Sequence, residues 1–156
     1  MSSMKYRSAP LAALGLVAAL TAMPAAAQYR NAEAAIKYRQ SAMSLQGNHM
    51  ARIFAMANGQ VPFDAKVAAE QIEVVSMLNR LQFAAFIDGS DKGNTRAKPE
   101  IWTEKDKFAA AVAKSQEDVA KLAAASKTGN LDQIKAAAGT VGQSCKACHD
   151  TYQKPQ

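Results

Sequence analysis

Three groups of turn-forming residues divide the chain beyond residue 30 into four segments, and apolar residues recur at helical spacing in each. The breaks are Asn58-Gly59 with Pro62, the stretch from residue 88 to residue 94, and Gly129. The predicted helices span about residues 31–58, 64–86, 99–127 and 131–152. Alanine is abundant and β-branched residues are sparse, which favours helices over a sheet. Because the links are short or moderate, we predict an all-α fold, an antiparallel up-down-up-down four-helix bundle.

Each segment carries one apolar stripe that we expect to face the core. Asp64 is the expected N-cap of the second helix, and Asn130 with Gln133 resembles a capping box at the start of the fourth. The four stripes are Ile36, Met43, Met50, Ile53 and Ala57; Val67, Val74, Val75, Leu78, Leu81 and Ala85; Ile101, Phe108, Val112, Ser115, Val119 and Leu122; and Leu131, Ile134, Ala138, Val141, Cys145, Cys148, His149 and Tyr152.

Residues 1–27 are predicted to be a cleaved signal peptide rather than part of the fold. Lys5 and Arg7 form a basic start, an apolar run covers residues 11–23, and three alanines precede Gln28. The apolar run is short for a membrane span, although an uncleaved anchor stays open as the alternative. The mature domain is then residues 28–156, located in the periplasm if the source is bacterial, with no membrane attachment after cleavage.

Charge excludes one class of partner. The chain carries a net charge of +6, and removal of Lys5 and Arg7 with the signal peptide leaves +4. The remaining positive charges alternate with Asp and Glu and form no basic block. We therefore expect no nucleic-acid binding.

The chemistry is concentrated in one motif, C-x-x-C-H, formed by Cys145, Cys148 and His149. Two thiols three residues apart lie on one face of a helix, where both can add to the vinyl groups at one edge of a porphyrin. His149 is four residues after Cys145 and shares that face, so its imidazole can ligate the iron. The motif predicts one covalently bound haem c per chain.

Other uses of the motif fit the sequence less well. A C-x-x-C redox pair prefers a βαβ context, and no strand pattern is present. A zinc site lacks a fourth ligand, because the other histidine, His49, is about 100 residues upstream. A disulfide between Cys145 and Cys148 on one helix would be strained. No Met follows His149, so any sixth iron ligand must come from an upstream helix.

The motif and three further segments resemble a known family. They are residues 145–152 at the end of the chain, 37–42 (KYRQSA), 84–86 (AAF) and 99–102 (PEIW). Together they resemble the class II cytochromes c, and within that class the cytochrome c′ family most. The resemblance implies haem near one end of a four-helix bundle, a five-coordinate iron, a homodimer through the first two helices, and binding of NO and CO. It also implies one-electron transfer with an unidentified redox partner in the periplasm.

The resemblance also assigns roles to individual residues. Arg39 and Gln40 match residues near the haem propionates, and Thr95 and Arg96 fall in a loop near the haem edge. Phe86, like Phe83, is expected against the porphyrin. Gln153 departs from the family, since relatives often carry Arg or Lys four residues after the axial histidine.

Met43 matches the residue that faces the open side of the iron. Two roles remain open for it: a cover over a five-coordinate iron, or the sixth ligand of a low-spin electron carrier. Ala42, Ser44 and Leu45 around it include no acid–base pair, so we expect a shielded apolar pocket that suits NO and CO better than O₂, and no enzymatic activity. His49 is expected at the surface, turned away from Met43.

Overall fold

The computed structural model describes residues 28–155. The predicted signal peptide, residues 1–27, lies outside the described residues. Within residues 28–155, no helix is long and apolar enough to span a membrane.

The described chain is helical, and the predicted four-helix bundle is confirmed. Its long helices are α1 (Ala32–Ala57), α2 (Ala65–Leu81), α4 (Lys105–Ser126) and α5 (Leu131–Tyr152). The side chains of Asn31, Asp64 and Asn130 accept hydrogen bonds from the first backbone N–H groups of α1, α2 and α5. These caps fix the helix starts within a residue of their predicted positions.

Two predicted helices differ from the structure in detail. The second segment leaves the α-helix after Leu81 and continues as a 3₁₀ turn, η2 (Gln82–Ala85). The third divides into a short helix α3 (Glu100–Thr103) and α4, because Glu104 leaves the helical region at φ −117°, ψ 50°. A tertiary hydrogen bond from Trp102 Nε1 to the Ile87 carbonyl, 3.0 Å, holds α3 on the preceding loop instead of in line with α4.

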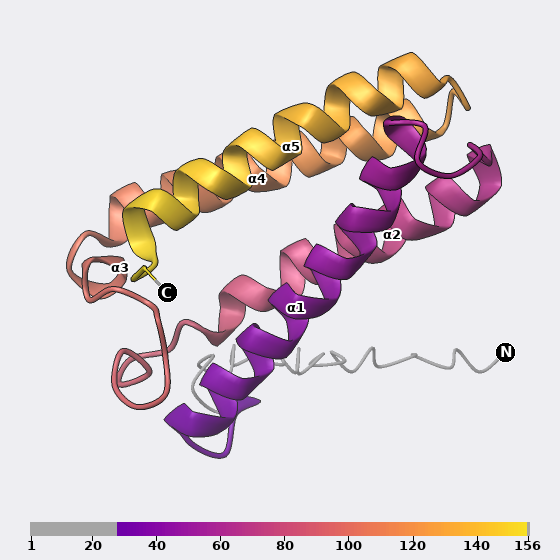
Figure 1. The fold of residues 1–156 in the computed structure, drawn as a ribbon. Helices are drawn as coiled ribbons and strands as arrows, with labels where there is room; N and C mark the ends of the chain where they lie inside the picture. Colours follow the sequence, from indigo (N-terminus) through magenta and orange to yellow (C-terminus); the bar gives the residue numbers. More distant parts are fainter. Residues whose placement is uncertain (1–27, 156) are drawn as a thin grey trace, which may run out of the picture.

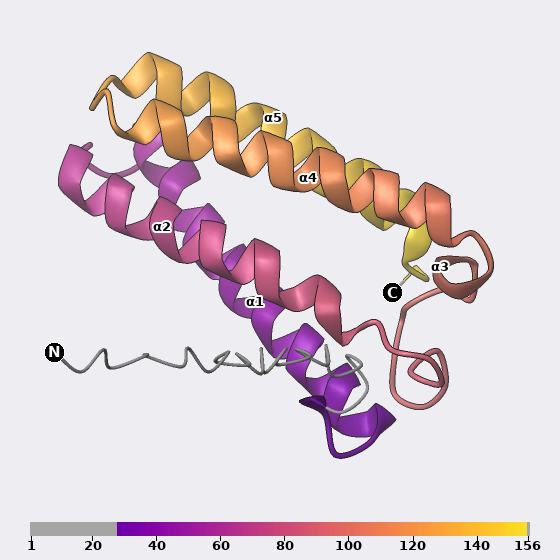
Figure 2. The ribbon, with the colours of Figure 1, turned by 180° about the vertical axis from the view of Figure 1, so that it is seen from behind.

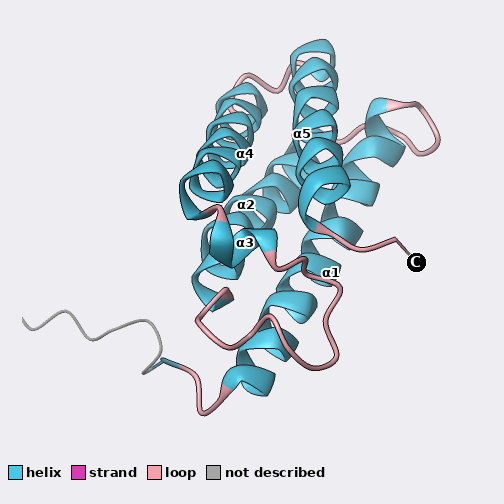
Figure 3. Cartoon of the chain, turned by 90° about the vertical axis from the view of Figure 1, so that its left-hand side faces the viewer, coloured by secondary structure: helices cyan, strands magenta, loops and turns pink. Residues whose placement is uncertain are grey.

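The four long helices form two antiparallel pairs, α1 with α2 and α4 with α5. The pairs contact each other through α2 with α4 and through α1 with α5. They lie close together at one end and splay apart at the other, which Figures 1 and 2 show from opposite sides. The chain between η2 and α3 crosses this splayed end, as Figure 3 shows. The splayed end is therefore closed by a loop rather than by a helix.

The core lies between the two helix pairs. The face of α2 that it buries differs from the predicted one. Val67 and Leu81 are exposed, at 41% and 44%, although the apolar spacing placed them inside. The buried face of α2 is instead Ala68, Ile72, Val75 and Asn79. Apolar residues occupy both faces of α2, so spacing alone cannot decide which face is inside. The best-buried core residues are Met50, Ile53, Ile72, Val75, Val119, Leu122, Ile134, Ala138 and Val141.

Replacement of Ile72 by Ala tests this core. Ile72 is 1% exposed and packs between the helix pairs, so Ile72→Ala leaves a cavity and is expected to lower the free energy of unfolding by about 2–5 kcal/mol. The measurement is urea denaturation followed by circular dichroism. Val61→Ala, at a residue that is 45% exposed, is the control and should change stability by less than about 0.5 kcal/mol. Equal losses in the two variants would contradict this packing.

Candidate functional site

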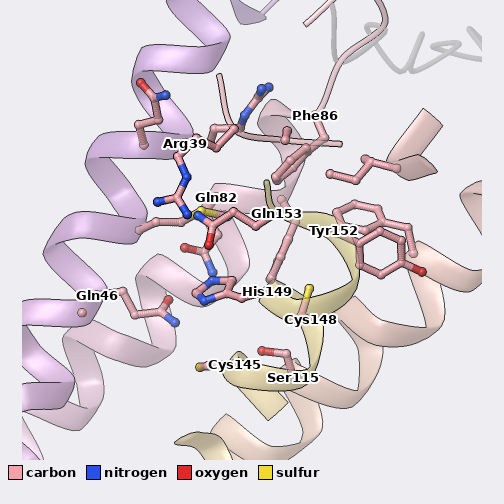
Figure 4. A pocket seen from close by; sticks show the side chains of 18 of the residues that line it. Arg39, Gln46, Gln82, Phe86, Ser115, Cys145, Cys148, His149, Tyr152 and Gln153 are labelled. Atoms are coloured by element: carbon pink, nitrogen blue, oxygen red, sulfur yellow. The ribbon is translucent and has the colours of Figure 1, made fainter. Parts of the chain in front are cut away.

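A pocket of about 470 Å³ lies between α1 and η2 on one side and α5 on the other, at the splayed end of the bundle (Figure 4). Its walls include aromatic rings from η2, α4 and α5. Every residue that the sequence assigned to the site lines it: Arg39, Gln40, Met43, Phe86, Thr95, Arg96, Cys145, Cys148 and His149. The structure thus brings residues more than 100 positions apart in the sequence to one cavity.

The two thiols are half-buried, unpaired and on the pocket side of α5. Burial raises the pKa of both Cys145 and Cys148 above the ordinary value for a thiol. For Cys145 the buried carboxylate of Asp118 acts in the same direction, although more weakly. Both thiols are therefore protonated at neutral pH, which leaves them less reactive than an exposed cysteine.

His149 enters the same pocket one helical turn after Cys145 (Figure 4). Desolvation by the pocket walls lowers the pKa of His149, the Arg96 guanidinium lowers it further, and Asp150 opposes both. A lower pKa favours the neutral imidazole, which is the form that ligates a metal. The residue itself stays exposed, so its ring is accessible from the cavity.

The end of α5 that carries His149 is fastened to the loop before α3. Lys98 donates its backbone N–H to the Tyr152 carbonyl at 2.9 Å, and Lys154 donates its own to the Arg96 carbonyl at 2.8 Å. The Arg96 side chain adds two hydrogen bonds to the Lys154 carbonyl, from Nε at 2.9 Å and from Nη2 at 2.7 Å. Arg96 and Lys98 also place positive charge at the negative end of the helix dipole. These contacts fix the position of His149 relative to the loop.

Arg39 reaches the same loop from α1 on the opposite side of the pocket. It is 2% exposed, and its Nη1 donates to Ser90 Oγ at 2.7 Å and to the Ala85 carbonyl at 3.2 Å. Its Nη2 donates to the Ser90 carbonyl at 2.7 Å and to Thr95 Oγ1 at 2.9 Å. Only the Nε–H remains for a further acceptor, so Arg39 offers a nearby carboxylate its charge and one hydrogen bond rather than a bidentate pair.

The charge of Arg39 has no carboxylate partner among the described residues. Its guanidinium lies over the Phe86 ring, 4.6 Å from the centroid, and 5.7 Å from that of Trp102. Desolvation lowers the pKa of Arg39 to about 10. A buried cation beside an apolar cavity is a favourable neighbour for an anionic group of a bound molecule.

The other predicted residues have simpler surroundings. Gln40 donates from Nε2 to the Asn94 carbonyl at 2.9 Å, and Thr95 Oγ1 also accepts the backbone N–H of Ala97 at 3.1 Å. Met43 is partly buried in the pocket wall, with no fixed polar partner. His49 lies outside the pocket wall, with Nδ1 2.7 Å from Gln71 Oε1, as expected for a residue turned away from Met43.

Sequence analysis missed two polar side chains of the pocket, Gln46 and Gln82. Gln46 and Gln82 are 7% and 3% exposed and line it, and Ser115 accepts a hydrogen bond from Asn79 Nδ2 at 3.0 Å in its wall. The pocket wall is mostly apolar, with these polar side chains as exceptions. The available signal was a glutamine three residues after Met43, on the same helix face.

Comparison with known proteins agrees with this geometry. Residues 34–153 match the family model described as "Cytochrome C'". The chain belongs to the cytochrome c′ family. Curated relatives include cytochrome c′ of Rubrivivax gelatinosus, 51% identical over 128 residues that cover 81% of this chain and 99% of the relative. Cytochrome c′ of Alcaligenes xylosoxydans xylosoxydans is 42% identical over 127 residues, covering 81% and 98%.

Solved cytochrome c′ structures share the fold. The crystal structure of the Rubrivivax gelatinosus protein aligns with a TM-score of 0.80, at 51% identity, and covers 81% of this chain and 100% of its own. A ferrous variant of the Alcaligenes xylosoxidans protein with bound NO aligns with a TM-score of 0.78, at 41% identity, and covers 82% and 99%. The predicted cytochrome c′ family membership and bundle fold are thus confirmed.

Haem c, covalently bound, is the cofactor of cytochrome c′ proteins and of this chain. The pocket fits it, because two unpaired thiols and an imidazole share one helix face, while Arg39 supplies an uncompensated charge for a propionate. Among residues 28–155, no cluster of three or more His, Cys, Asp or Glu side chains could hold a metal ion by itself.

The raised pKa values of Cys145 and Cys148 predict that both thiols react slowly with alkylating reagents in the protein before haem is attached. The pH at which the iodoacetamide rate reaches half its maximum should be higher for the folded chain than for the chain unfolded in urea, where it should lie near an ordinary thiol pKa of about 8.5. Mass spectrometry of samples quenched at each pH gives both profiles. Coincident profiles would show that the folded pocket does not bury the thiols.

Proposed function

We propose that the chain is a periplasmic haem protein in which Cys145 and Cys148 hold haem c through thioether bonds and His149 is the only axial ligand from the protein. One observation carries the proposal: α5 directs both thiols and the imidazole into one pocket. Met43 of α1 lines the same pocket. When bound, the haem supplies an iron that takes up one electron or one small gas molecule.

The protein's own residues prepare the pocket for that group. Phe83, Phe86 and Phe108 form a connected aromatic wall, with ring centroids 5.1–6.4 Å apart. Arg39 keeps one N–H and its positive charge for a propionate, and the loop contacts hold His149 in place. We therefore propose that the protein binds NO and CO and exchanges single electrons with a redox partner, and that it is not an enzyme.

The relatives give independent support for gas binding. Structures of variants of the Alcaligenes xylosoxidans protein have been solved, one with NO bound and one with CO bound. Those ligands occur in proteins about 41–42% identical to this one over nearly their whole length. The alternative function, a low-spin electron carrier with Met43 as sixth ligand, rests on the presence of Met43 in the same pocket.

An optical spectrum with and without NO separates the two functions. We expect a high-spin ferric spectrum and ready binding of NO by the reduced protein, because Met43 packs over the iron as a flexible cover rather than as a ligand. Met43→Ala should speed CO and NO binding and leave the resting spin state unchanged. A low-spin wild type with a sulfur-to-iron charge-transfer band that Met43→Ala abolishes would establish the electron carrier instead.

The outer faces of α1 and α2 support a homodimer. Large apolar side chains are exposed there: Tyr38 and Leu45 on α1, and Val67, Met77 and Leu81 on α2. Leu45 and Met77 are both 52% exposed, which is costly for a side chain that stays in water. We propose that a second copy of the chain covers this face.

Met77→Glu tests the dimer, because it places a charge in the proposed interface without touching the core. Sedimentation velocity should show a dimer for the wild type and a shift toward monomer for the variant, with at least tenfold weaker association. Lys146→Glu, at an exposed residue of α5 rather than of α1 or α2, is the control. A monomeric wild type at high concentration would refute the interface.

A further inference from the structure

One turn of α1 faces the pocket without a side chain. Seven residues of α1 line the pocket, and Gly47 is the only glycine among them. It lies inside the helix, four residues after Met43, so the two positions share one face of α1 with Cβ positions about 5–6 Å apart. A side chain at position 47 would lean toward the helix N-terminus and cover the turn that contains Met43. That turn is therefore open on this side.

The space beside Gly47 is free of atoms from the described chain. A Cβ atom at this position would meet nothing within 4 Å beyond its two chain neighbours and the backbone of its own helix, so even the Met43 side chain lies farther away. Gly142, the pocket glycine of α5, differs, because a Cβ atom there would lie 3.2 Å from Phe54 Cζ. Packing within the chain thus accounts for Gly142 and not for Gly47.

Backbone conformation does not account for Gly47 either. The described glycines with positive φ are Gly59, Gly89, Gly93 and Gly129, so Gly47 has an ordinary helical backbone. Glycine inside a helix destabilises it relative to alanine. The chain thus has a weak helix former at a position that lines the cavity and leaves space there.

Met43 is confined on its other side. Arg39, one turn before it, is 2% exposed and is fixed by four hydrogen bonds to the chain from Ala85 to Thr95. Arg39 cannot move without breaking those bonds, whereas the position one turn after Met43 has room around it. The flexible thioether of Met43 can therefore turn toward Gly47.

We infer that Gly47 determines whether Met43 can make room for a ligand in the pocket. The inference rests on the proposed function, in which Met43 covers the iron and a gas molecule binds on that side. The space at Gly47 receives the Met43 side chain when a diatomic molecule takes the position that the side chain covered. Gly47 is thus a positioning residue, because it acts through Met43. A larger residue there selects against gas binding and leaves Met43 itself unchanged.

Replacement of Gly47 by leucine fills the space. We expect CO association with the reduced, haem-loaded protein to become at least about tenfold slower in Gly47→Leu, because Met43 must then move against a packed side chain. Gly47→Ala adds a single methyl group and should slow association less, by about two- to threefold. Flash photolysis measures both rates, and mass spectrometry verifies that each variant carries haem.

A double variant tests whether the effect passes through Met43. In Gly47→Leu, Met43→Ala the side chain that must move is absent, so CO association should match that of Met43→Ala alone. Slow association that persists in the double variant would mean that the leucine obstructs the ligand or the haem directly. That result would overturn the inference.

Gly139 of α5 provides the matched control. It is also a helical glycine whose Cβ atom would meet nothing within 4 Å, but it lies outside the pocket wall. Gly47→Ala and Gly139→Ala should both raise the thermal midpoint by about 2–5 °C, because alanine is the better helix former. Gly139→Leu should leave CO association unchanged. A lower midpoint in haem-loaded Gly47→Ala would mean that the space is already filled, against the inference.

Crystal structures of the reduced protein with and without CO provide a readout that is independent of rates. We expect the Met43 side chain to shift toward Gly47 in the CO complex and to come within about 4 Å of its Cα atom, in van der Waals contact. Haem atoms in that space, or a Met43 side chain that keeps its position, would overturn the inference.

The outcomes separate this inference from the proposed function. A wild type that binds CO and NO, together with Gly47→Leu kinetics that match those of Gly139→Leu, refutes the role of Gly47 and leaves gas binding intact. A wild type that binds neither gas refutes the proposed function, and the role of Gly47 with it.

Discussion

The buried guanidinium of Arg39 organises the open end of this bundle. A charge inside a protein must find partners, and here it finds four oxygen atoms in the chain from Ala85 to Thr95. Those bonds draw the loop across the splayed end, and the loop in turn holds the last turn of α5 through Arg96 and Lys98. One interaction on α1 thereby determines where an imidazole on α5 lies.

The pocket has chemically different sides. α5 contributes the two thiols and the imidazole. α1 and η2 contribute the thioether of Met43 and the amides of Gln46 and Gln82. The core below is apolar, apart from Asn79, Ser115 and the buried Asp118, which pairs with Lys114 at its exposed edge. Polar side chains such as Gln46, Gln82 and Ser115 thus lie in the pocket wall. Their burial there lowers the stability of the fold.

Sequence reasoning succeeded where the signal was local. The caps at Asn31, Asp64 and Asn130 are short-range features, and the C-x-x-C-H spacing is set by a single helix. It failed where a distant contact decides the structure. The break at Glu104 depends on Trp102 bonding to Ile87, and the outward face of Leu81 depends on which neighbours α2 has. The burial of Gln46 and Gln82 likewise depends on helices that are distant in the sequence.

The loop from residue 86 to residue 99 is rich in turn residues, with Gly89 and Gly93 at positive φ, yet it is not a free segment. It is anchored to α1 at Arg39 and to α5 near Tyr152, so it cannot open at one end without breaking buried contacts at the other. Opening of this loop therefore breaks the four hydrogen bonds of the Arg39 guanidinium as well as the contacts with α5. We expect the amide hydrogen of Ser90 to exchange with solvent more slowly than the amide hydrogens of a loop without such anchors.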